Sequence, residues 1–209
     1  MAVDTVETPV GDARVDVRAA ADARVTLVLG HGAGGGIETP DLSTLARRLP
    51  ADGITVIRVE QPWHVAGRRA AAPPPTLDRA WLAVLDALDL PGPVAVGGRS
   101  AGARVACRTA TQVGAVGVVA LAFPLHPPGR PEKSRLEELL GSGVPTLVVQ
   151  GERDPFGGPE AFPRKRLRPY VVHAVRGADH SFRVPKGNDQ AATLADLAET
   201  VRRWVLDRR

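Results

Sequence analysis

Short strand-like segments recur along the chain, and segments with a helical pattern separate them. Most of the strand-like segments are continuous apolar runs, which is the pattern of strands buried on both faces of a parallel sheet. Strands are expected at residues 14–18, 25–29, 54–60, 93–98, 115–124, 145–151 and 170–175. Helices are expected at 39–49, 77–88, 100–113, 135–140 and 192–209, with a brief one near 159–166 and an irregular loop at 61–76. This alternation predicts an α/β fold, with a mostly parallel central sheet flanked by helices.

Length and composition predict one domain that covers residues 1–209. A chain of 209 residues has the size of a single domain, and a hydrophobic content of 44% excludes a disordered protein. No apolar stretch approaches the roughly 20 residues that a membrane-spanning helix needs. The first ten residues, MAVDTVETPV, lack the basic start and the apolar run of a secretory signal. We therefore expect a cytoplasmic protein without a membrane partner.

The net charge of +4 comes from basic residues that are spread along the predicted helices, with a local cluster at 163–169. No nucleic-acid-binding motif accompanies them, so solvated helix faces explain the charge and no nucleic-acid partner is expected. Cys107 is the only cysteine, which excludes an internal disulfide and a cysteine-based metal cluster. Its place within a predicted helix indicates a buried structural thiol. We expect neither a metal nor a cofactor.

The stretch VTLVLGHGAGGG at 25–36 ends an apolar run in five glycines within seven residues. Two interpretations are possible. Gly30, Gly32 and Gly35 fit G-x-G-x-x-G, the fingerprint of a dinucleotide site when it follows a strand. The same stretch fits the HG-x-G-G loop, which supplies a backbone N–H group to an oxyanion hole.

Residues 98–102, GRSAG, form the pattern G-x-S-x-G between a predicted strand and a predicted helix. This is the context of a nucleophile elbow, a turn so sharp that glycines are needed on both sides of the serine. Asp154 follows the strand at 145–151, and His180 follows the strand at 170–175. Because the carboxyl ends of parallel strands meet at one edge of the sheet, the three side chains are expected there together. Ser100 as nucleophile, His180 as base and Asp154 as orienting acid would form a catalytic triad.

Other acids and histidines near these positions are weaker candidates. Glu152 is the alternative acid, whereas Asp179 is adjacent to His180 in sequence and poorly placed to orient its ring. His31 is expected to brace the glycine loop. The remaining histidines follow strand ends or lie within a strand, and they are His64, His126 and His173.

The position of the next helix favours one interpretation of the glycine loop. A dinucleotide site needs a helix that opens at the glycines, so that its N-terminus meets the pyrophosphate. Here the helix signals begin later, at Thr39 and Pro40. The oxyanion interpretation is therefore favoured, with the N–H groups of Ala33 and Ala101 as the two donors. Glu60 supplies the ribose-binding acid that a nicotinamide oxidoreductase needs, which keeps that function as an alternative.

Taken in order, HGAGGG, GGRSAG, QGERDP and GADHSF resemble the motifs of the α/β-hydrolase superfamily over nearly the whole chain. More narrowly, EQPWHVAGRR, GGRSAGARVA and FPLHPPGRPEKSR resemble a group of small hydrolases with little or no cap, related to dienelactone hydrolases. The resemblance implies the hydrolase fold and the triad of Ser100, Asp154 and His180. Dienelactone hydrolases use a cysteine nucleophile where this chain has serine, which argues against transferring their substrate.

The predicted substrate site is open. Lid domains of this fold usually follow the sixth strand, where residues 125–144 leave room for one short helix and not for a full cap. Four residues that follow strand ends are predicted to wall the pocket, namely Trp63, His64, Phe156 and Phe182.

The function most consistent with these motifs is a serine hydrolase. It would cleave a small carboxylic ester or thioester through an acyl-enzyme intermediate. Arg99, next to the serine, is expected to pair with a neighbouring acid such as Glu60 rather than to recognise an anionic substrate. A non-catalytic interaction module built on the same fold is the main alternative, and the oxidoreductase is a more distant one.

Overall fold

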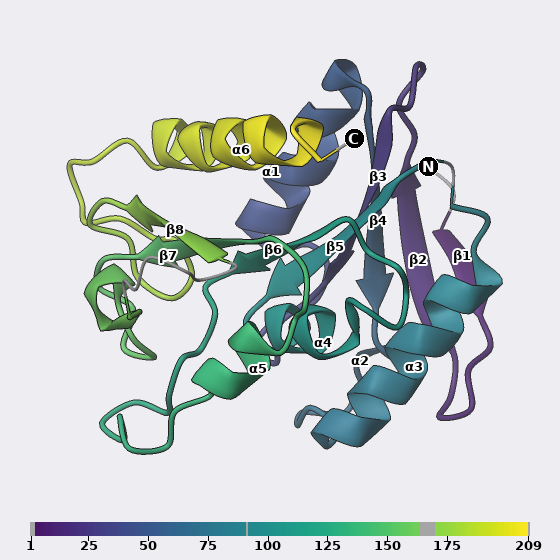
Figure 1. The fold of residues 1–209 in the computed structure, drawn as a ribbon, viewed down its shortest axis with the longest axis horizontal. Helices are drawn as coiled ribbons and strands as arrows, with labels where there is room; N and C mark the ends of the chain where they lie inside the picture. The colour runs from purple at the N-terminus through teal and green to yellow at the C-terminus, as the bar shows by residue number, and fades with distance from the viewer. Residues whose placement is uncertain (1–2, 91, 164–169, 209) are drawn as a thin grey trace.

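Within residues 3–90, 92–163 and 170–208, which the computed structural model describes, eight strands form one sheet (Figure 1). They are β1 (Val3–Val6), β2 (Ala13–Arg18), β3 (Val25–Gly30), β4 (Ile54–Glu60), β5 (Val94–Arg99), β6 (Gly117–Leu121), β7 (Thr146–Gly151) and β8 (Tyr170–Val175). Their order in the sheet is β1-β2-β4-β3-β5-β6-β7-β8. β1 pairs antiparallel with β2, and β2 with β4, whereas all other neighbours are parallel. The predicted single-domain α/β fold with a mostly parallel sheet is confirmed.

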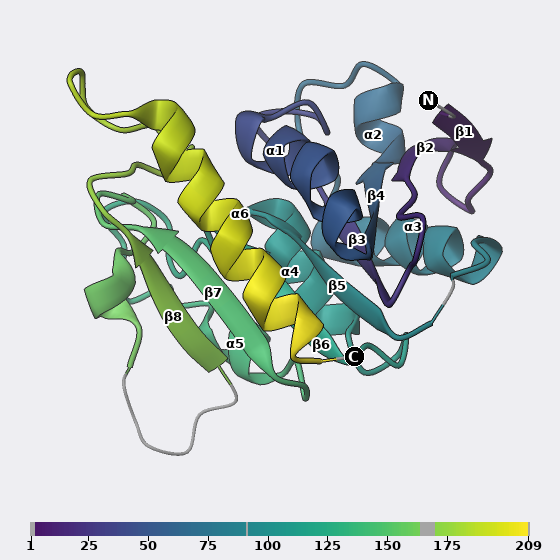
Figure 2. The ribbon, with the colours of Figure 1, turned by 90° about the horizontal axis from the view of Figure 1, so that it is seen from above.

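Helices cover both faces of the sheet (Figures 1 and 2). One face carries α1 (Pro40–Arg48) and α6 (Gln190–Leu206), which pack against each other. The other face carries α3 (Pro74–Ala87), α4 (Ala101–Thr109) and α5 (Leu136–Leu140). A four-residue helix, α2 (Pro62–Val65), follows β4, and short 3₁₀ helices lie at Leu49–Asp52 and Pro159–Ala161. In the described ranges, no helix is both long and apolar enough to cross a bilayer.

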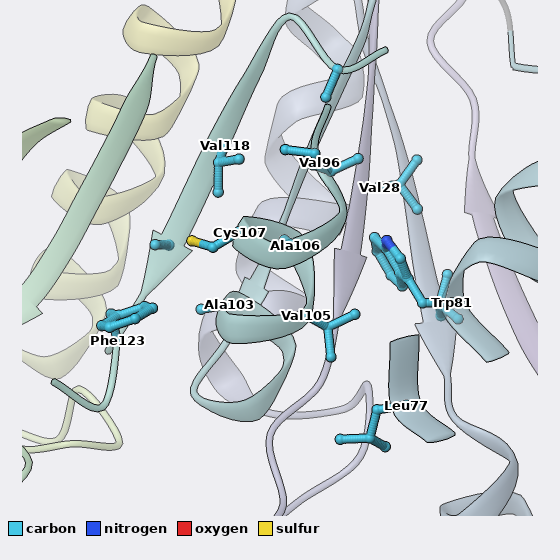
Figure 3. Packing of buried hydrophobic residues seen from close by; sticks show 14 of the residues in the cluster. Val28, Leu77, Trp81, Val96, Ala103, Val105, Ala106, Cys107, Val118 and Phe123 are labelled. Carbon is cyan, nitrogen blue, oxygen red and sulfur yellow. The ribbon is translucent and has the colours of Figure 1, made fainter. Parts of the chain in front are cut away.

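Two hydrophobic clusters fill the space between the sheet and its helices. The cluster beneath α3 and α4 contains Trp81, Phe123 and Cys107 (Figure 3). The cluster beneath α1 and α6 contains Leu42 and Phe182. Cys107 is fully buried, and burial raises the pKa of its thiol to about 12. The interpretation of Cys107 as a buried structural thiol is therefore confirmed.

The predicted irregular loop at 61–76 is partly wrong. α2 begins at Pro62 and α3 begins at Pro74. We expected these prolines to oppose regular structure, but they lie in the first turn of each helix. Proline is tolerated there because N–H groups of the first turn have no acceptor within the helix. β1 was not predicted, because its four residues form no apolar run and gain their order only by pairing with β2.

Several predicted boundaries also differ from the structure. The strand predicted at 115–124 is limited to Gly117–Leu121, and the helix predicted to reach residue 113 ends at Thr109. The brief helix predicted near 159–166 is a 3₁₀ turn at Pro159–Ala161. Residues 164–166 of that prediction, and most of the basic cluster at 163–169, lie outside the described residues.

A buried ion pair joins β2 to β4. Asp16 and Arg58 are cross-strand partners and are each 2% exposed. Arg58 donates from Nη2 to Asp16 Oδ2 at 2.7 Å and from Nη1 to the carbonyl oxygen of Ile37 at 2.8 Å. Burial opposes the ionisation of Asp16, but hydrogen bonds from Arg18 and Arg58 outweigh it and hold the pKa of Asp16 below its usual value. The pair therefore links the sheet to the segment that precedes α1.

We predict that Asp16→Asn lowers the free energy of unfolding at neutral pH by about 3–5 kcal/mol, because the Arg58 charge is left buried without its partner. Since the pKa of Asp16 is lowered in the folded protein, the unfolded chain takes up its proton first as the pH falls. The stabilisation is therefore complete above the ordinary carboxyl pKa of about 4 and is lost as the pH falls through the folded-state value.

Urea unfolding at about pH 7 and about pH 3 measures both effects, and the difference between wild type and Asp16→Asn should narrow at the lower pH. A difference of equal size at both pH values would contradict the assignment. Glu199→Gln is the control, because it breaks a pair with Arg202 in which the Glu199 side chain is 45% exposed. It should leave stability nearly unchanged.

Candidate active site

Ser100 lies in a sharp turn between β5 and α4. Its backbone has a φ of 53° and a ψ of −108°, a region that residues other than glycine rarely occupy and that persists only where the surroundings enforce it. The amide of Ser100 donates to the carbonyl oxygen of Leu121 in β6 at 2.9 Å, which fixes the turn at the carboxyl edge of the sheet. The turn has the shape that the G-x-S-x-G pattern predicts.

The two glycines of this turn lie directly against the last residue of β3. A Cβ atom on Gly98 would lie 2.5 Å from the carbonyl oxygen of Gly30, and one on Gly102 would lie 2.4 Å from the same oxygen. The expected collision across the turn is also present, since a Cβ atom on Gly98 would lie 2.8 Å from the carbonyl carbon of Gly102. The backbones of β3 and α4 therefore lie in direct contact and leave no room for a side chain at these two positions. The sequence pattern alone does not reveal this contact.

Ser100, His180 and Asp154 form a continuous chain of hydrogen bonds. His180 Nε2 lies 3.0 Å from Ser100 Oγ, and His180 Nδ1 lies 2.8 Å from Asp154 Oδ2. Because a carboxylate only accepts hydrogen bonds, Nδ1 carries the proton and donates it to Asp154. Nε2 is then the acceptor for the hydroxyl of Ser100. The Asp154 side chain is fully buried, whereas that of His180 is 18% exposed, so the ring remains accessible while the acid is shielded.

Two further donors hold Asp154 in place. Gln150 Nε2 donates to Asp154 Oδ2 at 2.8 Å, and the amide of Phe156 donates to Oδ1 at 2.8 Å. Gln150 is fully buried near the end of β7 and also donates to the carbonyl oxygen of Gly157 at 2.7 Å. The motifs do not single out Gln150, although a polar residue within the apolar run LVVQG is an available signal.

The glycine loop is crowded by the protein itself. At three of its glycines, an added Cβ atom would lie within 3.3 Å of a neighbouring side chain. The neighbours are Arg99 and Ser100 at Gly32, Thr39 at Gly35, and His64 at Gly36. Gly34, by contrast, has open space around it. The shortage of side chains in this loop is therefore explained by close packing against the elbow, against α1 and against α2.

His31 braces the glycine loop, as predicted. The residue is 3% exposed, and its Nε2 accepts a hydrogen bond from the amide of Gln61 at 3.0 Å. Nδ1 therefore carries the hydrogen and donates to the carbonyl oxygen of Gly32 at 2.8 Å. Burial lowers the pKa of His31, which favours the neutral ring that this hydrogen-bond pattern requires.

The position of α1 removes the basis of the dinucleotide interpretation. α1 begins at Pro40, so the glycines do not lie at the helix N-terminus that a pyrophosphate needs. Of the two predicted oxyanion donors, Ala33 is exposed in the turn of the glycine loop, and Ala101 is the first residue of α4. The first N–H groups of a helix have no partner within it, so the start of α4 is suited to accept an anion.

Three of the four predicted pocket residues lie around the site. The ring centroid of Phe156 is 4.3 Å from that of His180. His64 is 34% exposed, bonds to Glu60 through Nδ1 at 2.5 Å and lies against the glycine loop. Trp63 is buried at 6% exposure and lines a cavity beside Ala101 of about 10 Å³, enough for one water at most.

The prediction for Phe182 is wrong. Its side chain is fully buried in the cluster beneath α6, and its backbone φ is 54°. The left-handed conformation turns the side chain into the core, so Phe182 anchors the turn after His180 and does not wall a pocket.

The weaker candidates make structural contacts instead. Glu152 accepts a hydrogen bond from the amide of Gly177 at 2.7 Å, and Asp179 accepts one from the amide of Ser181 at 2.8 Å. The two remaining histidines contact Pro127 and Thr200 respectively, and they are His126 and His173.

Arg99 forms a buried ion pair, but not with the acid that we expected. Its Nε lies 3.5 Å from Asp41 Oδ2 in α1, and the two side chains are 7% and 1% exposed. Burial raises the pKa of Asp41, and the charge of Arg99 offsets only part of that effect. Glu60 bonds to His64 instead, because Glu60 ends β4 and β3 separates that strand from β5.

The connection between β6 and β7 contains one short helix, α5, and no full cap, as predicted for this segment. Glu138 of α5 accepts hydrogen bonds from Arg104 at 2.6 Å and from Arg108 at 2.8 Å. Arg108 also pairs with Asp78 of α3 at 2.6 Å. Burial opposes the ionisation of Glu138, but the two arginines outweigh it and lower its pKa. The pairs of Glu138 hold α5 against α4, and the pair with Asp78 holds α3 against α4.

We predict that Gly102→Ala destabilises the protein by about 1–3 kcal/mol or more, because the added methyl group has to displace the end of β3. Thermal or urea unfolding measures the loss. Gly34→Ala is the matched control, since the same methyl group at residue 34 meets open space. Equal stability of the two variants would contradict the proposed backbone contact.

Comparisons with known proteins agree with this architecture. A family model described as an alpha/beta hydrolase domain matches residues 23–206. A solved serine hydrolase without lid, from Xanthomonas campestris, is 22% identical with a TM-score of 0.73 over 98% of this chain and 94% of its own. A dienelactone hydrolase from Anabaena variabilis is 17% identical, with a TM-score of 0.76 over 99% and 96%. An esterase domain from Rhodothermus marinus is 17% identical, with a TM-score of 0.68 over 98% of each chain.

At these identities the solved structures show a likeness of fold, whereas the family model covers most of the sequence. The chain therefore belongs to the alpha/beta hydrolase domain family and is an enzyme of the α/β-hydrolase type.

Proposed function

We propose that this protein is a serine hydrolase that cleaves a carboxylic ester or thioester of a small molecule. The observation that carries the proposal is the geometry around His180, whose Nε2 lies 3.0 Å from Ser100 Oγ while its Nδ1 lies 2.8 Å from Asp154. A serine hydroxyl becomes a useful nucleophile when a neutral base accepts its proton and a third group fixes the tautomer of that base. In this site His180 is suited to be the base, and Asp154 is suited to fix its tautomer.

In the proposed first step, Ser100 Oγ attacks the carbonyl carbon of the substrate while its proton passes to His180 Nε2. Asp154 stabilises the imidazolium that forms. The tetrahedral intermediate then collapses, and the alcohol or thiol leaves with the proton from Nε2. In the second half, water attacks the acyl-Ser100 ester, gives its proton to Nε2, and releases the acid and free enzyme.

The amides of Ala33 and Ala101 are the proposed donors to the negative oxygen of both tetrahedral intermediates. The braced glycine loop and the N-terminus of α4 support this role, because donors that are fixed before reaction need no reorganisation. Losing one such donor typically lowers the rate by about 100- to 1000-fold.

Two observations support an ester or thioester as the substrate. Ser100 and His180 are both partly exposed, and the connection after β6 holds only one short helix, so a substrate reaches the serine without a full lid. A dienelactone hydrolase and an esterase domain share the fold. An interaction module without catalysis is the alternative, and covalent labelling separates the two.

We predict that a fluorophosphonate probe labels Ser100 covalently and that Ser100→Ala abolishes the labelling while the protein stays folded. Intact-mass spectrometry measures the adduct, and circular dichroism checks the fold. Labelling that persists in Ser100→Ala would show that the nucleophile is elsewhere. A folded wild-type protein that the probe does not label would favour the interaction module.

We predict that Asp154→Asn lowers kcat for p-nitrophenyl acetate by about 10³- to 10⁴-fold, because an amide at this position no longer holds the imidazole in the required tautomer. Glu152→Gln is the matched control, since Glu152 lies two residues away and its side chain accepts a hydrogen bond from the amide of Gly177 rather than from His180. A large loss in Glu152→Gln together with an active Asp154→Asn would assign the acid to Glu152.

A further inference from the structure

Arg99 precedes Ser100 in the chain and reaches the turn that carries His180. Both hydrogens of its Nη2 are used there, one on the carbonyl oxygen of His180 at 3.0 Å and one on Ser181 Oγ at 2.9 Å. Its Nε lies 3.5 Å from Asp41, and its Nη1 would lie 3.2 Å from a Cβ atom on Gly32. One guanidinium thus contacts the base-carrying turn, α1 and the glycine loop.

The buried position of this arginine has an energetic cost that a purely apolar residue would avoid. Arg99 and Asp41 are 6% and 1% exposed, and Arg99 Nε makes no hydrogen bond to a described residue. Among the described residues, the Asp41 carboxylate has only weak interactions with the Thr39 side chain and the amides of Asp41 and Leu42 besides its contact with Arg99. A buried ion pair that lacks complete hydrogen bonding is weak support for stability, and an apolar pair of similar size is often as stable. The buried pair of Arg99 and Asp41 is therefore better explained by the groups that the guanidinium holds in position than by its contribution to stability.

Other contacts also hold the turn at His180, and they involve the neighbouring residues Asp179 and Phe182. Asp179 Oδ1 accepts hydrogen bonds from the amides of Ser181 and Arg183 at 2.8 and 3.0 Å. Phe182 is fixed in the core beneath α6. These contacts shape the turn internally and attach it to α6. The amide of Arg153 also donates to the carbonyl oxygen of Ala178 at 2.9 Å, which attaches the start of the turn to the segment after β7. The hydrogen bonds from Arg99 attach the main chain of His180 to the strand that carries Ser100.

We propose that Arg99 is a positioning residue for His180, with Asp41 as the counter-charge that holds its guanidinium in place. This inference rests on the proposed function of Ser100 and His180. Ser100 and Arg99 are adjacent, so the elbow and the contact with the His180 carbonyl move as one rigid unit. Two contacts therefore fix the distance from His180 Nε2 to Ser100 Oγ. Arg99 holds the main chain of His180, and Asp154 holds its ring.

This role requires the planar fork of arginine. Its three nitrogens face Asp41, the His180 turn and Gly32 separately, whereas lysine offers one nitrogen. Gly32 leaves the space that the guanidinium occupies. A displacement of about 1 Å between a base and its nucleophile can lower a rate by about 100-fold, so loss of this contact should be visible in kcat.

The test compares Arg99→Met, Arg99→Lys and Ser181→Ala with wild type. We expect Arg99→Met to lower kcat for p-nitrophenyl acetate by about 10- to 100-fold, with KM changed by less than about threefold. Arg99→Lys should recover part of the loss, because it keeps a charge beside Asp41. Ser181→Ala removes only one of the two acceptors on the turn and should lower kcat by a few-fold.

A readout without substrate keeps this inference separate from the proposed function. The ring N–H of His180 that bonds to Asp154 is followed by ¹H–¹⁵N NMR, and we expect its signal to broaden or disappear in Arg99→Met. Arg108→Met is the matched control, since Arg108 of α4 forms a partly buried pair with Asp78 of α3, away from the site. It should lower thermal stability yet keep both kcat and the His180 signal.

The outcomes are distinct. If Arg99→Met loses stability like Arg108→Met but keeps kcat and the His180 signal, Arg99 is merely structural and the inference is overturned. If Arg99→Met does not fold, Arg99→Lys and Ser181→Ala decide, and wild-type kcat in both overturns it. If Ser100 is not the nucleophile, either the wild type is not labelled or the label persists in Ser100→Ala, whereas the NMR comparison still reports whether Arg99 fixes the His180 ring.

Discussion

The approach of β3 to the start of α4, backbone against backbone, is the constraint on which the site depends. A Cβ atom at Gly98 or Gly102 would lie within 2.5 Å of the Gly30 carbonyl oxygen. This contact brings the strand that leads into the glycine loop beside the strand that leads into Ser100. With any larger residue, the loop and Ser100 would separate, and the oxyanion donors proposed on either side could not face one substrate oxygen.

Charged groups then fix the loop and the turn around that contact. Arg58, paired with Asp16, holds the carbonyl oxygen of Ile37 at the end of the glycine loop. Arg99 reaches from the elbow to the turn of His180. Because burying charges is costly and their pairing only offsets that cost, these pairs contribute more to geometry than to net stability. Apolar burial in the two clusters on either face of the sheet supplies the main stabilisation.

The sequence predicts the parts of this site that depend on strand order. Ser100, Asp154 and His180 each follow a segment that the sequence predicts as a strand, and the carboxyl ends of parallel strands share an edge, so their proximity can be expected without coordinates. Phe182 cannot be placed in the same way, because its positive φ and its burial beneath α6 depend on how the whole turn packs. The partner of Arg99 also escapes prediction, since Asp41 is close only through the packing of α1 over the sheet. Gln150 is hidden for a similar reason, because its role depends on the turn at Gly157.

The buried thiol of Cys107 can be used to measure how often the structure opens locally. With full burial and a pKa of about 12, the sulfur is neither reachable nor ionised while α4 stays docked on the sheet. Reaction with a thiol reagent therefore has to wait for the cluster around Trp81 and Phe123 to open. Since α4 begins next to Ser100, the rate of that reaction reports how often the helix that supports Ser100 opens.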